Sequence, residues 1–213
     1  MVSLRQGTVK MKKILLALVL FFGFSGFAKA QTAEDIKQIE DYLNNIKTLD
    51  AKFVQTASNG GAAEGHIYIS KPNKIRMEYA PPVDVLIVGD GDYVVYNDKE
   101  LDQVTHIDYS DIPATVILAD NIKIDGKALK VIDFDKDAGT TMITVEQGEK
   151  SSIGPITLIF SNQPEFELKQ WRIVDPQSVE VSVSLYDTIK DGKLDSGLFK
   201  FKDKKKSPLN YKK

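Results

Sequence analysis

The sequence predicts a mainly β domain with few helices, built on a single curved antiparallel sheet that buries one face. Three observations lead to this prediction. One amphipathic helix opens the domain, apolar residues then recur at every second position, and short turn sequences separate the resulting segments. Connections this short join antiparallel neighbours and leave no room for βαβ crossovers.

The opening helix is predicted from a start signal and an apolar stripe. Thr32 is a favourable N-cap, and Glu34 and Asp35 fall in the first turn, where the helix dipole favours acids. The apolar side chains that recur at helical spacing are Ile36, Ile39, Leu43 and Ile46. A lone helix of this length is only marginally stable, so we expect the stripe to pack on the rest of the domain.

The strands are separated by turn residues. Asp90-Gly91 gives the clearest hairpin, and Asn59-Gly60-Gly61, Asp125-Gly126 and Asp191-Gly192 mark further turns. The predicted strands are residues 53–56, 66–70, 74–79, 83–88, 93–97, 101–107, 129–133, 140–146, 156–160, 166–174 and 179–187. Between the sixth and seventh strands, residues 111–120 have Pro113 in a first turn and then small and apolar residues, which predicts a short helix that is buried or covers an apolar surface.

The chain begins with features of an export signal. Basic residues precede an apolar run at 14–24, and Ala28-Lys29-Ala30 supplies small residues at the cleavage positions. We therefore expect residues 1–30 to be a cleaved secretory signal peptide, residues 31–199 to form one domain, and the protein to be located in the periplasm. The chain has no cysteine, so we expect neither a lipid-anchored lipoprotein nor a disulfide scaffold.

Charge is distributed unevenly along the chain. Of the 28 basic residues five lie in 1–30, which holds no acid, so residues 31–213 carry 23 basic against 30 acidic groups, a net charge of −7. This balance argues against a nucleic-acid partner, because binding depends on phosphate neutralisation. The C-terminal tail, residues 200–213, is rich in lysine, and it is either a solvated terminus or a transient electrostatic contact with an anionic membrane or acidic partner.

No motif in the sequence argues for an enzyme. The two histidines, His66 and His106, fall in predicted strands, and the common zinc, serine-hydrolase and phosphate-loop signatures are missing from the sequence. A hydrolase that uses one of these histidines with a nearby acid is the rival hypothesis. The excess of apolar residues on the strands fits either an ordinary core or a cavity left partly unfilled for a lipid.

The stretch Glu64–Tyr79, EGHIYISKPNKIRMEY, resembles the signature of the periplasmic outer-membrane lipoprotein carriers, the LolA family. That signature is a Gly-led strand, Arg-Pro, and an alternating strand that ends in Glu-Tyr before a proline. Phe53-Val54-Gln55 resembles the family's Phe-x-Gln, residues 88–97 (VGDGDYVVYN) resemble its hairpin, and Gln103-Val104 stands ahead of the helix near Pro113. The similarity covers nearly the whole of residues 31–213.

The resemblance implies a half-open barrel, a strongly curved sheet covered on its concave face by short helices. It implies a monomeric, non-enzymatic chaperone without cofactor or metal, which holds the acyl chains of lipoproteins in an apolar cavity. The residues expected to contact these chains are Ile36, Ile39, Leu43, Phe53, Ile67, Ile69, Ile75, Met77, Val85, Ile87, Val94, Tyr96, Ile117, Leu118, Ile143, Leu158, Phe160 and Trp171.

Two positions depart from the family's pattern. Lys71 stands where the family has an Arg whose hydrogen bonds hold the lid helices, and lysine keeps the charge without the planar fork, so a looser lid latch is expected. Met77 stands at the usual Trp position and suits an irregular apolar pocket. The expected lid helix includes Pro113, Ala114, Ile117 and Leu118.

The resemblance also implies partners. The carrier would take lipoproteins from an inner-membrane ABC transporter and pass them to an outer-membrane receptor lipoprotein. Two alternatives keep the fold and change the role: an envelope sensor or regulator that binds exposed lipoprotein chains or misfolded envelope proteins, and a carrier of another lipid.

Overall fold

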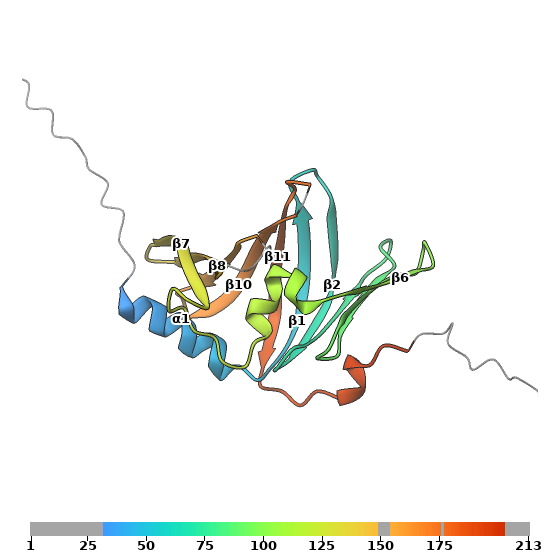
Figure 1. Cartoon of the computed structure of the whole chain (residues 1–213), viewed down its shortest axis with the longest axis horizontal. Helices are drawn as coiled ribbons and strands as arrows, with labels where there is room; N and C mark the ends of the chain where they lie inside the picture. The colour runs from blue at the N-terminus through green and yellow to red at the C-terminus, as the bar shows by residue number, and fades with distance from the viewer. Residues whose placement is uncertain (1–31, 149–153, 176, 203–213) are drawn as a thin grey trace, which may run out of the picture.

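A single antiparallel sheet of eleven strands, one α-helix and three short 3-10 helices make up the part of the chain that the computed structural model describes, residues 32–148, 154–175 and 177–202 (Figure 1). The prediction of one antiparallel sheet with few helices is confirmed. The expected signal peptide and the tail beyond Lys202 lie outside the described residues.

Each predicted strand is present, with bounds that differ by a few residues. The elements are α1 (Ala33–Asn45), β1 (Thr48–Ala57), β2 (Ala62–Ser70), β3 (Lys74–Tyr79), β4 (Val85–Gly89), β5 (Val94–Asp98), β6 (Gln103–Ile107), η1 (Tyr109–Asp111), η2 (Pro113–Leu118), β7 (Leu129–Lys136), β8 (Thr140–Gln147), β9 (Ile156–Ser161), β10 (Glu167–Val174), β11 (Glu180–Lys190) and η3 (Ser196–Phe199).

Local signals explain where α1 starts and why β1 was predicted too short. The Thr32 hydroxyl accepts the Asp35 backbone N–H, and the Asp35 carboxylate accepts the Thr32 N–H, so the expected N-cap is a full capping box. β1 begins at Thr48, five residues before the predicted start. The start was missed because no Gly or Pro marks the change from helix to strand. The predicted helix at 111–120 consists of two 3-10 helices, η1 and η2.

The order of strands across the sheet is β6-β5-β4-β3-β2-β1-β11-β10-β9-β8-β7. The sheet is therefore not one continuous meander: the first and last strands pair at its centre and join two wings, β2–β6 and β7–β10. β6 and β7 are consecutive in the chain but lie at opposite edges, so residues 108–128 have to cross from one edge to the other. This connection carries η1 and η2.

The core lies on the concave side of the sheet, between the two wings and the helices. The ring of Tyr42 on α1 meets Phe160 and Phe166 edge-on, with centroids 5.6 and 5.7 Å apart, and fixes α1 against the β9–β10 wing. Three register irregularities, in the β1–β11, β9–β10 and β7–β8 pairs, bend the strands and help to curve the sheet.

The C-terminal segment packs on the opposite, convex face. Val88 and Val95 are paired neighbours on β4 and β5 and point to this face, together with Arg76 on β3. Nη1 of Arg76 donates to the Leu198 carbonyl at 3.0 Å, and Phe199 is only 3% exposed. Helix η3 is therefore anchored to the outside of the β2–β6 wing, at the other end of the molecule from α1 (Figure 1).

Candidate functional site

The concave face of the sheet is lined by rows of apolar side chains from paired strands. On one wing Ile67, Met77, Ile87 and Tyr96 stand opposite one another in β2 to β5. A second row runs from Ile143, Leu158 and Trp171 of the other wing to Val183 of the central strand β11. Because side chains alternate between the two faces of a strand, each row presents one continuous apolar surface to the interior.

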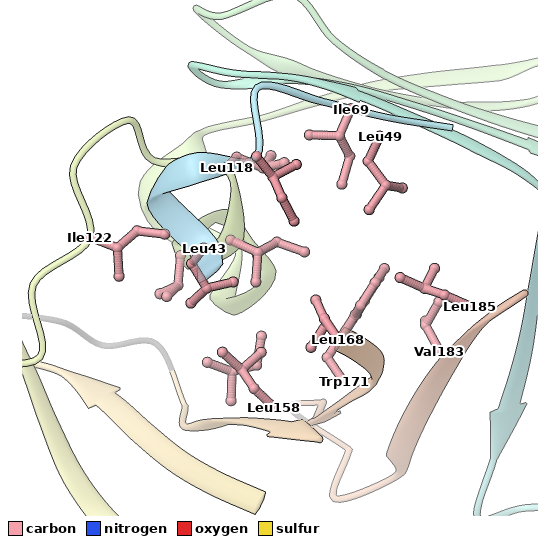
Figure 2. Close-up of a cluster of buried hydrophobic side chains, with 14 of the residues drawn as sticks. Leu43, Leu49, Ile69, Leu118, Ile122, Leu158, Leu168, Trp171, Val183 and Leu185 are labelled. Carbon is pink, nitrogen blue, oxygen red and sulfur yellow. The ribbon is translucent and has the colours of Figure 1, made fainter. Parts of the chain in front are cut away.

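Short helices close this surface from the front. We call η1 and η2, residues 109–118, the lid. Val116, Ile117 and Leu118 of η2 are buried and join one core cluster with Ile39 and Leu43 of α1. Figure 2 shows Leu43 and Leu118 facing side chains of both wings, among them Ile69 and Leu158.

The space between the sheet and these helices is almost filled. The cavity that described residues line there has a volume of about 20 Å³, which is room for about one water molecule. Its lining residues are Tyr42, Leu43, Ile46, Leu49, Ile69, Lys71, Ile117, Leu168, Trp171 and Leu185. At this place side chains of the lid and α1 occupy most of the interior that the resemblance implied to be vacant.

A second hollow, about 280 Å³ in volume, lies at the other end of the concave face. Small side chains of β1 and β2 form one wall, including Ala57 and Ala63, and Tyr79, Val85 and Tyr96 form the other. Tyr79 Oη donates to Gln55 Oε1 at 2.7 Å, and burial raises the pKa of this phenol to about 12. This hollow stays open while the lid is closed.

The ring of Phe53 separates this hollow from the packed core. It meets Tyr79 edge-on with centroids 5.0 Å apart, and it is almost completely buried. Gly65 provides the space for the ring, because a Cβ there would lie 2.8 Å from Phe53 Cε1 and 2.1 Å from the Glu78 carbonyl oxygen. The glycine that leads the strand in the sequence signature is therefore explained by the packing of the Phe53 ring against it.

The turn between β2 and β3 holds both helical parts of the interior. Lys71 Nζ donates to the Leu43 carbonyl in the last turn of α1 at 2.6 Å. Two residues on, the Asn73 N–H donates to the Leu118 carbonyl at the end of η2 at 3.0 Å. The Lys71 side chain therefore bonds to α1, and the attachment of η2 is made by the backbone of Asn73.

The Lys71 ammonium lies in the wall of the apolar cavity. Burial, helped by the charge of the neighbouring Lys47 and opposed by Asp120, lowers its pKa from the ordinary 10.5 to about 8. Lys47 and Asp120 form an ion pair of their own at 3.6 Å. An ammonium with this pKa remains mostly charged at neutral pH, but its charge is held against a desolvation cost.

Tyr109 of η1 forms a further attachment of the lid. Its hydroxyl donates to the Asn73 carbonyl, and burial raises the pKa of the phenol to about 12. Gly89, at the end of β4, makes room for it: a Cβ at that position would lie 2.2 Å from the Tyr109 hydroxyl and 2.9 Å from Ile75 Cγ2. Sequence reasoning missed Tyr109, because its contacts with Asn73 and Gly89 are visible only in the folded chain.

The chain that leaves the lid is tied to α1. The Asn44 side chain donates to the Ile122 carbonyl at 2.9 Å and accepts the Ile122 N–H at 2.7 Å. The Ile124 N–H donates to Glu40 Oε1 at 2.6 Å. The lid and its exit are therefore held by a small number of separate polar contacts rather than by a ladder.

Most residues expected to contact acyl chains lie together. Ile36 and Ile87 are partly buried and pack against the core cluster; Val85 and Tyr96 line the open hollow; Val94 is buried in the row of Ile75 and Gly89. The expected residues that are buried within the cluster are Ile39, Leu43, Phe53, Ile67, Ile69, Ile75, Met77, Ile117, Leu118, Ile143, Leu158, Phe160 and Trp171. Pro113 and Ala114 open η2.

Several residues of the interior were not expected. They come from the missed start of β1, from the inner rows of β10 and β11, from the lid and from the chain after the lid. They are Leu49, Leu168, Val183, Leu185, Val116, Ile122 and Ile124. The alternation of Val183 and Leu185 was visible in the sequence, whereas Ile122 and Ile124 belong to a loop without a recognisable pattern.

The two histidines lie on the outer face of the sheet. His66 Nε2 is 2.5 Å from Asp50 Oδ1, and its ring stacks on Tyr68 with centroids 4.5 Å apart. His106 is paired with Val95 and meets Tyr93 edge-on. Among the described residues, no group of three or more His, Cys, Asp or Glu side chains could hold a metal ion, and no helix is long and apolar enough to cross a membrane.

Comparison with known proteins places these features in a family. The family model described as outer membrane lipoprotein carrier protein LolA matches residues 44–202. An uncharacterized protein of Rickettsia prowazekii is 28% identical over 203 residues, which cover 91% of this chain and 89% of that protein. An outer-membrane lipoprotein carrier protein of Chromohalobacter salexigens is 27% identical over 190 residues, with 82% and 85% covered.

A shorter match is closer in sequence. The outer-membrane lipoprotein carrier protein of Chromobacterium violaceum is 39% identical over 84 residues, which cover 38% of this chain and 41% of that protein. Among solved structures, a LolA superfamily protein from Nitrosomonas europaea superposes with a TM-score of 0.48 at 9% identity, covering 81% of this chain and 99% of that chain.

Proposed function

We propose, on the premise that this chain belongs to the LolA family of outer membrane lipoprotein carrier proteins, that it binds the acyl chains of lipoproteins on the concave face of its sheet. It would carry them through the periplasm as a monomeric chaperone, without catalysis. The observation that supports this most is the covered apolar face, where side chains of the lid fill the space that an acyl chain would take.

The proposal requires the lid to move. A cavity of about 20 Å³ admits no acyl chain, so loading has to displace Val116, Ile117 and Leu118 from the interior. Exposing each of these side chains costs about 1.5–3 kcal/mol, and burying one long acyl chain gains on the order of 10 kcal/mol. Because the two quantities are of the same order, loading would be favourable and still reversible.

The finer part of the proposal concerns the route. The carrier would receive lipoproteins from an inner-membrane ABC transporter and deliver them to an outer-membrane receptor lipoprotein. Support comes from the relatives that are outer-membrane lipoprotein carrier proteins, a role that implies a location in the cell envelope.

The test replaces a buried lid residue by a charged one. Ile117→Glu, or Leu118→Glu, prevents the lid from packing into the core, so an acylated peptide should bind about tenfold more tightly and lipoprotein release from spheroplasts should change. Leu101→Glu is the matched control, since Leu101 is 69% exposed. Circular dichroism checks that each variant is folded. Unchanged peptide affinity and unchanged release in a folded variant would remove the lid from the proposal.

The alternatives are separated by the bound molecule. Mass spectrometry of the protein purified from its native periplasm should find acylated lipoproteins. A different lipid found there would point to a carrier of that lipid, and misfolded envelope proteins would point to a sensor or regulator.

A further inference from the structure

The small cavity under the lid has a charged group in its wall. Among the described residues that line it, Lys71 alone carries a charge, and the others are aliphatic or aromatic. Figure 2 shows three of these residues facing one another, with Ile69 on one side and Leu168 and Trp171 on the other. Ile117 of the lid lines the same cavity. The displacement of the lid that loading requires would therefore enlarge the space that the Lys71 side chain borders.

Lys71 has a neutral hydrogen-bond acceptor and lacks a counter-ion. Its Nζ donates to the Leu43 carbonyl at 2.6 Å, and no ion pair within the described part of the chain includes it. Asp120, the acid whose charge acts on Lys71, forms its ion pair with Lys47 at 3.6 Å. The carboxylate of Asp191 accepts the backbone N–H of Lys47 at 2.7 Å. The positive charge of Lys71 is therefore left for an anion from outside the chain.

The position of Lys71 suits the head group of an amphiphile. The residue is half-buried, so a molecule bound to its ammonium can keep its head near solvent and place its tail in the interior. A carboxylate beside the ammonium would offset the desolvation that lowers the pKa of Lys71 to about 8, because an opposite charge favours the charged form. A neutral carbonyl would only replace the acceptor that Leu43 already supplies. Lys71 therefore favours a carboxylate over an uncharged head group.

We propose that the interior takes a second class of ligand, free long-chain fatty acids, with the carboxylate on Lys71 Nζ and the hydrocarbon tail between the two wings of the sheet. The tail gains affinity with its buried length, and a charge-assisted hydrogen bond is stronger than one to a neutral acceptor. Residues 31–199 hold 16 basic and 29 acidic residues, a net charge of −13. Because this charge repels anions from most of the surface, the ammonium in the cavity wall marks a preferred place for one.

This inference rests on the proposed function, because a fatty acid needs the same displacement of the lid, and it adds a ligand that differs chemically from a lipoprotein. Acyl chains attached to a protein are uncharged esters or amides, whereas a free fatty acid carries a carboxylate at neutral pH. Fatty acids are released when lipid esters are hydrolysed. A carrier with this preference would take up the products of that reaction in the cell envelope.

The test compares dodecanoate with dodecanol, two ligands that share a tail and differ in the head group. Equilibrium dialysis of the radiolabelled ligands at neutral pH against the purified protein, residues 31–213, gives the two affinities. Their ratio isolates the head group, because the contribution of the tail cancels. In Lys71→Met the ratio of dodecanoate affinity to dodecanol affinity should fall about tenfold or more. In Lys71→Arg, which keeps the charge, it should stay within about threefold of the native value.

A control variant and a second measurement protect the test against an unfolded variant. Lys123→Met removes an exposed lysine from the chain after the lid and should leave the ratio unchanged. Circular dichroism checks that each variant is folded. After reductive methylation of the native protein with isotope-labelled formaldehyde, the resonance of Lys71 is assigned by its absence in Lys71→Arg. The pKa read from this resonance should rise with dodecanoate, because an anion favours the charged ammonium, and should not rise with dodecanol.

Four results would overturn the inference. They are an unchanged ratio in folded Lys71→Met, an equal fall of the ratio in Lys123→Met, a pKa of Lys71 that does not rise with dodecanoate, and no binding of dodecanoate to the native protein.

An acylated peptide added to the same samples separates the two proposals. Peptide binding to the native protein, without a preference for the carboxylate that depends on Lys71, would refute the fatty-acid site and leave the proposed carriage standing. Binding of dodecanoate that depends on Lys71, without any affinity for the peptide, would do the reverse.

Discussion

At the scale of single residues, Lys71 combines a favourable hydrogen bond with the unfavourable desolvation of its ammonium group. Its ammonium donates to the Leu43 carbonyl, but it does so in an apolar wall that lowers its pKa to about 8. Burying a charge with few partners offsets much of what its hydrogen bond contributes. A contact of this kind holds α1 against the β2–β3 turn with only a small net gain in stability.

The pH dependence of stability should reveal this cost. In the unfolded chain the pKa of Lys71 returns to its ordinary 10.5, so between pH 8 and 10.5 the unfolded state binds more protons than the folded state. The free energy of unfolding should therefore rise with pH across this window, relative to Lys71→Met. Urea unfolding at several pH values measures the difference. The exposed Lys123→Met is the control, and a difference between the native protein and Lys71→Met that stays constant with pH would contradict the prediction.

The sequence identified Lys71 by its place before Pro72 but not its partner. Its hydrogen-bond acceptor is a backbone carbonyl 28 positions away, on a helix whose position depends on the whole core. Tyr109 was missed for the same reason: a tyrosine after a strand is unremarkable until Gly89 and Asn73 are brought beside it.

At the scale of elements, the lid is held to the sheet edge by a fitted contact. Its 3-10 turns are too short for a stable helix on their own, and η2 has no side-chain cap. The position of η1 depends on the Tyr109 hydroxyl, which crosses Gly89 to reach the Asn73 carbonyl. The lid is therefore ordered by its contacts with the sheet, and weakening one contact should loosen it.

Gly89→Ala tests this dependence. The added methyl group would overlap the Tyr109 hydroxyl, so the ring has to shift, the hydrogen bond is lost, and the protein should lose about 1–3 kcal/mol of stability. An acylated peptide should also dissociate faster. Gly139→Ala is the control, since a Cβ there would have its nearest neighbour at 3.7 Å. Equal effects of the two substitutions on unfolding and on peptide dissociation would show that η1 does not depend on this contact.

The strands and α1 were predictable, because alternation, helical spacing and turn residues are local signals, whereas η3 was not predicted. The bounds shifted where such a signal was lacking, as at Thr48. The lid consists of two 3-10 helices, and the carbonyl of Leu118 at its end accepts the Asn73 N–H.

At the scale of the whole molecule, the pairing of β1 with β11 could not be read from the sequence. That pairing joins strands more than a hundred residues apart and places two wings on either side of a central ladder. The fold class follows from local periodicity and short connections, whereas the order of strands depends on which long-range pairing buries the most apolar surface. The resemblance to a family supplied the half-open shape in advance.

Opening for a ligand should therefore be confined to one layer of the molecule. On adding an acylated peptide, amide hydrogens of Asn73, Ile122 and Ile124 should exchange faster, because their acceptors lie on the lid and α1. Amides of β1 and β11 should stay protected. Hydrogen exchange read by mass spectrometry compares these peptides directly. Faster exchange in the central ladder, or continued protection of Asn73, would mean that the wings separate instead.

The crossing of residues 108–128 from β6 to β7 has a last consequence. Because both ends of this segment are joined to distant edges of the sheet, a displaced lid would remain close to the interior. A bound acyl chain would therefore compete for the interior with lid side chains that stay next to it. Release would then need no external energy source, because the lid side chains would return to the interior once the acyl chain moves to a site of higher affinity.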